Sequence, residues 1–445
     1  MMKFKYGLLL ILFTIYSNLA FSGGTKPKSY SDISKYIDNP MLIEHLKNNS
    51  KQRFELIESN QAINDKDRVK ETLEASLNCL EKFSTSLHQN ENIPIKNNNY
   101  LTLAKEGFKW ATAEINGTYG YDENAAKARS LWYSTTERRF LGDAYERSMA
   151  FYYLGVIYML YGDYEKARAT FKAGTIQDEI PGVFEEVNVD GEIKTREMIN
   201  KGKSDTNALN LMAALASIKH HHTKKNNNSL AIANEYFGKI VTHKSKLKAF
   251  INSIKKIVLE NPNFKIVIIE TGYGPRKLGD GLYFNELIYK RGKNNIINRV
   301  AINDESIPII ESLYYQAKST GFKEIDRIVN GKVKYREKSK LVSSYIGKAA
   351  TITHMATIFG SSDSTGLGSV LVLGGVAMDI ATANVNTRVD DRYWINLPNK
   401  IRIAVLKENE PNIKLRVSYK KRANKRRNTF EYESKSNLSW IRLYD

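Results

Sequence analysis

One segment, residues 144–174, constrains the fold more than any other, because small and large side chains alternate in it at helical spacing. Gly155 and Ala167 have little side chain, so two antiparallel helices can approach closely where they cross. The large side chains that would fill the space on either side are Phe151, Leu154, Tyr158 and Phe171. Gly162 suits a turn between the two halves, and Asp163 can cap the second helix. The segment therefore predicts a tightly packed helical hairpin.

The order aromatic-x2-Leu-Gly-x2-Tyr-x8-Ala-x3-Phe in this segment resembles the tetratricopeptide repeat, with Phe151 at the position where Trp is commoner. An amphipathic hairpin of unrelated origin is the alternative. Because a single repeat cannot bury both of its faces, neighbouring helices are needed. Residues 205–219 and 229–242 suggest a second hairpin, in which Ala233 and Phe237 repeat the Ala-x3-Phe spacing.

Apolar residues three or four apart predict further helices upstream of the hairpin, at residues 40–64, 67–83 and 100–116. We therefore expect a tetratricopeptide-like helical domain over residues 23–245. The single cysteine, Cys79, lies in one of these helices and is expected to be a small buried apolar side chain.

Three consecutive histidines, His220, His221 and His222, are expected in a solvated loop over residues 220–228. Adjacent residues of a loop do not converge on one ion as histidines four apart on a helix would, and no nearby Cys or paired carboxylate completes a ligand shell. We therefore predict no metal site and no cofactor.

The second half of the chain changes to short β-rich runs and turns, which predicts a mixed α/β domain over residues 262–445 with a β-rich end. The fold class is thus α+β. The predicted strands are residues 265–270, 298–302, 312–317, 325–329, 332–336, 401–406, 414–419, 430–432 and 440–443. Residues 401–406 and 414–419 are expected to pair with each other. Helices are expected at residues 339–359 and 366–385, where the second is either a closely packed helix or inserts into a membrane interface.

Residues 1–22 have the composition of a secretory signal peptide. Lys3 and Lys5 precede the apolar run 7–16, and the small residues Ala20 and Ser22 follow at the spacing that a signal peptidase recognises. An uncleaved N-terminal anchor is the alternative. No cysteine follows the apolar run, so lipid attachment of the bacterial lipoprotein type is not expected. We predict export to the periplasm, peripheral association with the outer membrane, or secretion.

The formal net charge is +19, which favours anionic partners at long range. The densest group of basic residues comprises Lys414, Arg416, Lys420, Lys421, Arg422, Lys425, Arg426 and Arg427. This run is a candidate patch for an anionic glycan or lipid surface, while the export signal disfavours a specific nucleic acid. The alternative is a solvated edge strand, since Lys and Arg at a sheet edge also deter aggregation.

Two segments of the second half combine turn residues with charge. Gly274 and Pro275 follow the strand predicted at 265–270, and a glycine on each side of Tyr273 followed by proline favours a structural turn. The alternative is a loop that presents backbone N–H groups with Arg276 or Lys277 to an anion. Further on, Asp390 or Asp391 can pair with Arg392, while Trp394 and Leu397 can anchor the turn before the last strands.

Residues 140–147, the Gly274-Pro275-Arg276-Lys277 run and the set Asp390, Arg392 and Trp394 occur in an order that resembles a family of uncharacterised bacterial exported proteins, many of them lipoproteins. The resemblance implies a tetratricopeptide-like helical half and a mixed C-terminal half. It implies no enzymatic role.

We therefore predict a non-catalytic scaffold of the cell envelope that binds a protein or peptide. The candidate groove residues are Tyr152, Tyr153, Tyr161 and Tyr164, since stacked hairpins form concave surfaces. A core position is the alternative for Tyr152 or Tyr153. The alternative is a basic module that binds an anionic envelope polymer or lipid surface. An enzyme using Glu146 with Arg147 is disfavoured, because no catalytic set of Ser, His, Cys or paired acids is visible.

Overall fold

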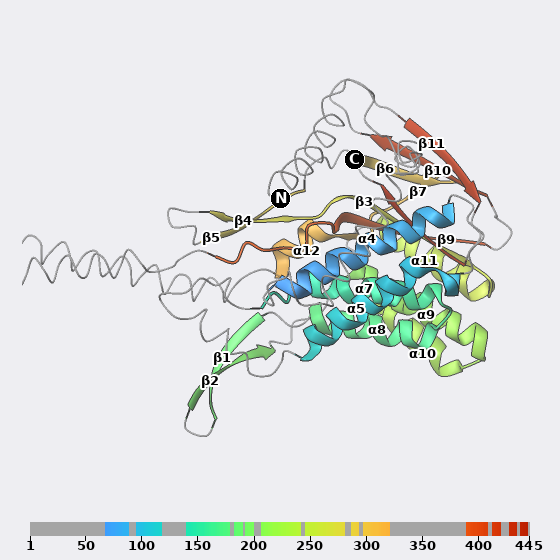
Figure 1. Ribbon diagram of the computed structural model, residues 1–445. Helices are drawn as coiled ribbons and strands as arrows, with labels where there is room; N and C mark the ends of the chain where they lie inside the picture. Colours follow the sequence, from blue (N-terminus) through green and yellow to red (C-terminus); the bar gives the residue numbers. More distant parts are fainter. Residues whose placement is uncertain are drawn as a thin grey trace, which may run out of the picture.

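The computed structural model describes residues 67–88, 95–117, 139–178, 182–189, 192–199, 206–241, 245–280, 286–292, 297–320, 389–407, 412–419, 427–433 and 437–443. The predictions for residues 1–22, 40–64, 325–336, 339–359 and 366–385 lie outside these ranges. Most of the described elements form a layer of helices and two four-stranded β-sheets, with one of these sheets between the helices and the other sheet (Figure 1). The α+β prediction is confirmed.

The helical layer consists of paired helices, and those expected at 67–83 and 100–116 are both present. Its members are α4 (Arg68–His88), the short 3-10 helix η2 (Ile95–Asn97), α5 (Asn99–Gly117), α7 (Ala144–Leu160), α8 (Tyr164–Asp178), α9 (Asn207–Lys224), α10 (Asn227–Lys239) and α11 (Ser245–Glu260). The pairs α4/α5, α7/α8 and α9/α10 are in contact, α5 packs on α7, and α8 packs on α9. The helices therefore form one continuous stack.

The hairpin α7/α8 has the packing that its small residues predict. A Cβ at Gly155 would lie 2.4 Å from the ring of Phe171, so only glycine allows this approach. Ala167 is fully buried beside it. Asp163 accepts a hydrogen bond from the backbone N–H of Lys166 at 3.2 Å, as expected for a cap of α8.

The prediction of a loop over residues 220–228 is wrong. The three histidines continue α9, whose end is marked by Lys225 in the left-handed conformation, and α10 begins two residues later. The helix can extend because its polar side chains find partners there. His220 Nδ1 lies 2.8 Å from Ser229 Oγ, and His222 Nε2 lies 2.8 Å from the carbonyl oxygen of Val258.

The inner sheet has the strand order β12-β3-β9-β8. Its strands are β3 (Lys265–Tyr273), β8 (Glu311–Ser312), β9 (Pro398–Leu406) and β12 (Leu438–Leu443). Its central strand, β3, is buried on both faces. Ile266 and Ile268 belong to the core shared with the helices, whereas Val267 and Ile269 belong to the core shared with the outer sheet. This alternation explains why the segment is a continuous apolar run.

The outer sheet has the order β11-β10-β6-β7. Its strands are β6 (Ile297–Ile302), β7 (Glu305–Ile307), β10 (Asn412–Tyr419) and β11 (Arg427–Glu433). The predicted pairing of 401–406 with 414–419 is wrong, because β9 and β10 belong to different sheets. Their alternate apolar residues, such as Ala404 and Leu415, join the same core between the two sheets. The two strands thus pack face to face instead of sharing a ladder.

A short helix and two pairs of strands complete the described fold. The strand predicted at 312–317 is wrong: Leu313–Thr320 forms helix α12, which buries Leu313 and Ala317 four residues apart. Strands β4 (Arg276–Asp280) and β5 (Glu286–Lys290) pair with each other. Strands β1 (Gly182–Val189) and β2 (Glu192–Ile199) form a hairpin that projects from the helices and was not predicted (Figure 1).

Candidate functional site

Three segments that are far apart in the sequence meet at the start of α7: residues 140–147, strand β4 and a strap that we define as residues 389–397. Lys277 Nζ lies 3.0 Å from Asp143 Oδ1, and the Tyr289 hydroxyl donates to Asp143 Oδ2 at 2.6 Å. The backbone N–H of Gly274 donates to the carbonyl oxygen of Leu397 at 2.7 Å. The predicted motif residues lie on both sides of this bond, with Gly274, Pro275, Arg276 and Lys277 in the turn before β4 and at its start, and Asp390, Arg392 and Trp394 in the strap.

Glu146 is the centre of this cluster and is completely buried. One carboxylate oxygen accepts the N–H of Asp143 at 2.7 Å, which satisfies a free donor at the helix start. The other accepts the N–H of Trp394 at 2.6 Å and so ties the strap to α7. The pKa of Glu146 is raised to about 7, because burial and the nearby charge of Asp143 raise it more than Lys277 and the two backbone hydrogen bonds lower it.

Two other groups of the cluster, Lys277 and Tyr289, are held in their ordinary protonation states. Burial lowers the pKa of Lys277, but the carboxylates of Asp143, Glu146 and Asp390 outweigh it, so the pKa is raised and the ammonium persists. Burial raises the pKa of Tyr289 well above its usual value, so the phenol stays neutral. Both groups can therefore donate hydrogen bonds to Asp143 at the start of α7.

Lys277 does not present its charge to an external anion, which was the alternative interpretation of this segment. The residue lies on β4, its side chain is 2% exposed, and its partner is the carboxylate of Asp143 at 2.9 Å. Only Gly274 and Pro275 separate β3 from β4, as expected for the structural turn that the sequence favours.

The strap is fixed to both neighbouring helices. Arg392 donates to both carboxylate oxygens of Asp390, at 2.9 and 2.7 Å, and to Asp67 at 2.9 Å. The pairing expected between Asp390 and Arg392 is confirmed. Asn396 donates to Asn78 Oδ1 of α4 at 2.8 Å. These bonds lock residues of the second half onto the helical layer.

A second buried polar cluster was missed by sequence reasoning. Tyr153 donates to Glu270 Oε2 of β3 at 2.9 Å, and Arg442 of β12 lies 3.6 Å from the same carboxylate and 3.3 Å from Glu81 of α4. Burial raises the pKa of Glu270 to about 7, while Arg442 opposes the shift. The available signal was the presence of Glu270 and Arg442 inside otherwise apolar strands, since such charges need partners.

The predicted groove is also wrong for two of its four residues. Tyr152 and Tyr153 are fully buried, and the ring of Tyr153 packs against Trp394 and Trp440 at centroid distances of 5.9 and 6.2 Å. Tyr161 and Tyr164 are half-buried against the same core. The inner sheet therefore covers the helix face that a peptide would have occupied.

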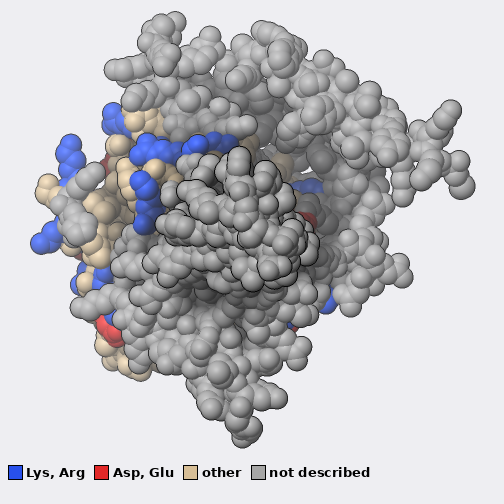
Figure 2. All heavy atoms as spheres, turned by 90° about the vertical axis from the view of Figure 1, so that its left-hand side faces the viewer, with Lys and Arg blue, Asp and Glu red and all other residues tan. Residues whose placement is uncertain are grey.

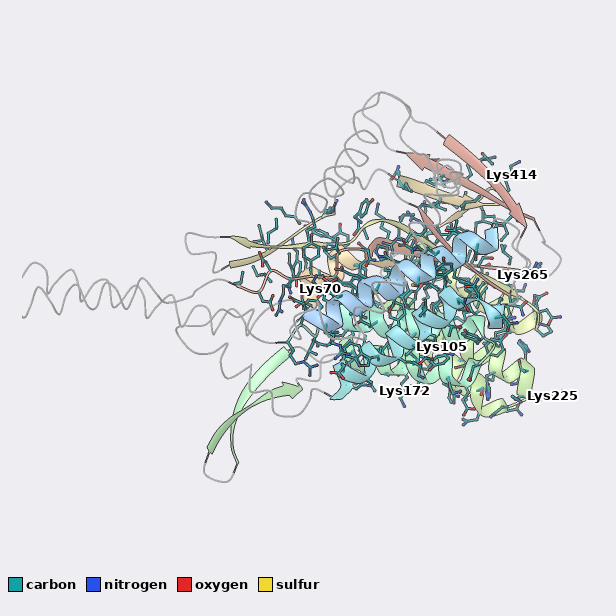
Figure 3. All side chains as sticks on the ribbon, viewed as in Figure 1. Lys70, Lys105, Lys172, Lys225, Lys265 and Lys414 are labelled. Atoms are coloured by element: carbon teal, nitrogen blue, oxygen red, sulfur yellow. The ribbon has the colours of Figure 1, made fainter. Side chains whose placement is uncertain are left out.

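The predicted basic patch is described only at Lys414, Arg416 and the backbone of Arg427. Lys414 is exposed, Arg416 forms an ion pair with Asp304, and Arg427 pairs in register with Ser418. The remaining members lie outside the described residues: Lys420, Lys421, Arg422, Lys425 and Arg426. Figure 3 shows labelled lysines on separate elements along the whole body, so positive charge is widely spread.

Within the described ranges, no three His, Cys, Asp or Glu side chains are placed to hold a metal ion. No helix described there is long and apolar enough to cross a bilayer. Cys79 is buried, and burial raises the pKa of its thiol to about 12. No protein-family model, curated protein or solved structure matches the chain.

Proposed function

We propose that the chain is a non-catalytic, exported scaffold of the bacterial cell envelope, with tetratricopeptide-like hairpins that hold a protein or peptide. Support comes from the close packing of the hairpins. Gly155 meets Phe171 within α7/α8, and a Cβ at Gly174 of α8 would lie 2.9 Å from Leu209 of α9. Small residues at such crossings are typical of repeats that stack. The resemblance to exported bacterial proteins belongs to the same proposal.

The observation that carries the proposal is an apolar stripe on the outer side of the stack. Ala169, Ala173 and Ile176 recur at helical spacing on α8; Ala169 is exposed, Ile176 is 46% exposed, and Ala173 between them is partly buried against the core. A stripe of this spacing fits the apolar face of an amphipathic partner segment. Because the inner sheet already covers Tyr153, the partner docks on this outer stripe and not in the groove expected from the sequence.

The test uses tagged full-length protein, cross-linked in cells and recovered from separated envelope and cytoplasmic fractions. We expect one partner to be cross-linked to wild type and to be lost from Ala169→Arg and Ile176→Arg, which change the two exposed members of the stripe. Asn252→Arg, which adds the same charge at an exposed site of α11, serves as the matched control. Retention of the partner by both α8 variants would refute the docking stripe, and recovery of the chain only from the cytoplasm would refute export.

A further inference from the structure

Helix α12 and the end of β5 carry exposed aromatic and basic side chains that pack against each other. The Tyr315 side chain is 61% exposed. The Arg291 guanidinium lies 4.9 Å from the centroid of Tyr314 and 5.7 Å from that of Tyr315, and it donates to the Tyr315 hydroxyl at 3.0 Å. These contacts hold the two rings and the charge in a fixed arrangement at the surface.

Neighbouring residues extend this surface. Lys318 Nζ lies 5.5 Å from the centroid of Tyr314, and Lys290 is exposed next to Arg291. Tyr273 is 36% exposed and lies next to these residues. Its carbonyl oxygen contacts Gly292, where a Cβ would lie only 2.1 Å from that oxygen. We call this set the aromatic–basic surface: Tyr273, Lys290, Arg291, Tyr314, Tyr315 and Lys318.

Among the described residues, no carboxylate neutralises the positive charges of this surface. In the part of the chain that the structure describes, neither Arg291, Lys290 nor Lys318 forms an ion pair, whereas Arg416 of the outer sheet does. From the side of the molecule on which β4, β5 and α12 lie, the described surface shows more Lys and Arg than Asp and Glu (Figure 2). An anionic partner would therefore meet ammonium and guanidinium groups that have no competing carboxylate.

We propose that the aromatic–basic surface binds an acidic polysaccharide. The electron-rich faces of tyrosine rings attract the C–H groups on the flat sides of sugar rings, as they attract other positive edges. The guanidinium of Arg291 matches the planar geometry of a uronate carboxylate, and Lys318 adds a second cation. The site is independent of the stripe on α8, so its failure and that of the proposed scaffold function are separable.

The experiment measures retardation of the purified full-length protein in gels that contain polygalacturonate, a carboxylated sugar polymer, or neutral dextran. We expect retardation by polygalacturonate alone. Tyr315→Ala, which changes no charge, and Arg291→Ala should each weaken binding about tenfold. Lys172→Ala removes one charge from exposed α8 and should stay within about twofold of wild type, because a remote surface charge is screened.

Three outcomes would overturn the proposal. If Tyr315→Ala bound polygalacturonate as well as wild type does, the binding would come from the net charge of the protein and not from the tyrosine rings. An equal loss of affinity in Lys172→Ala and Arg291→Ala would lead to the same conclusion. Tighter binding to a single-stranded oligonucleotide, or to anionic phospholipid vesicles, would assign the surface to another class of ligand. The melting temperature of each variant is measured in parallel, since side chains this exposed can be changed without unfolding the protein.

Discussion

Glu146 shows how a single buried carboxylate joins two parts of this protein. The residue is in the first turn of α7, and its two oxygens accept N–H groups from Asp143 and from Trp394, which is 248 positions further along the chain. This one side chain thus ties residues 140–147 to the strap. Sequence reasoning paired Glu146 with Arg147, but Arg147 donates to the carbonyl oxygen of Gly142 at 2.9 Å.

The raised pKa of Glu146 predicts a stability that depends on pH. An acid with a pKa of about 7 in the folded state and 4.5 otherwise favours folding at low pH, and this contribution is lost as the pH rises through 7. We expect Glu146→Gln to reduce the fall in unfolding free energy between pH 5 and 8 by roughly 2 to 3 kcal/mol. Urea denaturation at each pH measures it, and Glu165→Gln, at an exposed site of α8, is the control. Parallel profiles for wild type and Glu146→Gln would contradict the assignment.

The hairpin α7/α8 shows which kind of element can be predicted from the sequence alone. Its glycine, alanine and aromatic spacing predicts the two helices and their contact, because all of the interacting residues lie within one short segment. Strand β9 is different. Its apolar alternation identifies a strand, but its neighbours β3 and β8 are distant in the chain, so no local feature specifies the pairing.

Two glycine substitutions test separately how packing and helix propensity affect the stability of these helices. Gly155→Ala places a methyl group against Phe171 and should destabilise the protein by about 1 to 3 kcal/mol. Gly238→Ala lies in α10, where a Cβ meets no atom within 4 Å, and should stabilise it by about 0.5 to 1 kcal/mol. Thermal denaturation measures both. A neutral or stabilising Gly155→Ala would show that the hairpin is less tightly packed than described.

At the scale of the whole molecule, the helices and the inner sheet share one apolar core. Trp394 and Trp440 from the second half pack with Tyr153 of α7, and Ile268 and Ile403 belong to the same cluster. The predicted domain boundaries at 245 and 262 remain predictions. The shared core nevertheless means that separating the halves would expose a large apolar sheet face.

We therefore expect a fragment of residues 245–445 to fail to fold alone. Without the helices, the side chains of Ile268, Ile403 and Trp440 would be exposed to solvent. An apolar surface of this extent drives aggregation. Circular dichroism in the near ultraviolet and binding of a hydrophobic dye measure the outcome. The full chain is the control, and a soluble fragment with native-like aromatic signals would show that the second half is autonomous.

The sequence alone determined the elements whose interacting residues are close in the chain: the helices at 67–83 and 100–116 and the α7/α8 hairpin. It also limited the partner of Arg392 to Asp390 or Asp391, and a short run of β-branched residues identified the strand at 265–270. The tertiary structure decided which element covers each face. It buried Tyr152 and Tyr153, made residues 313–320 helical and divided β9 and β10 between two sheets. Periodicity reports which residues share a face, whereas the partner of that face depends on contacts between residues hundreds of positions apart.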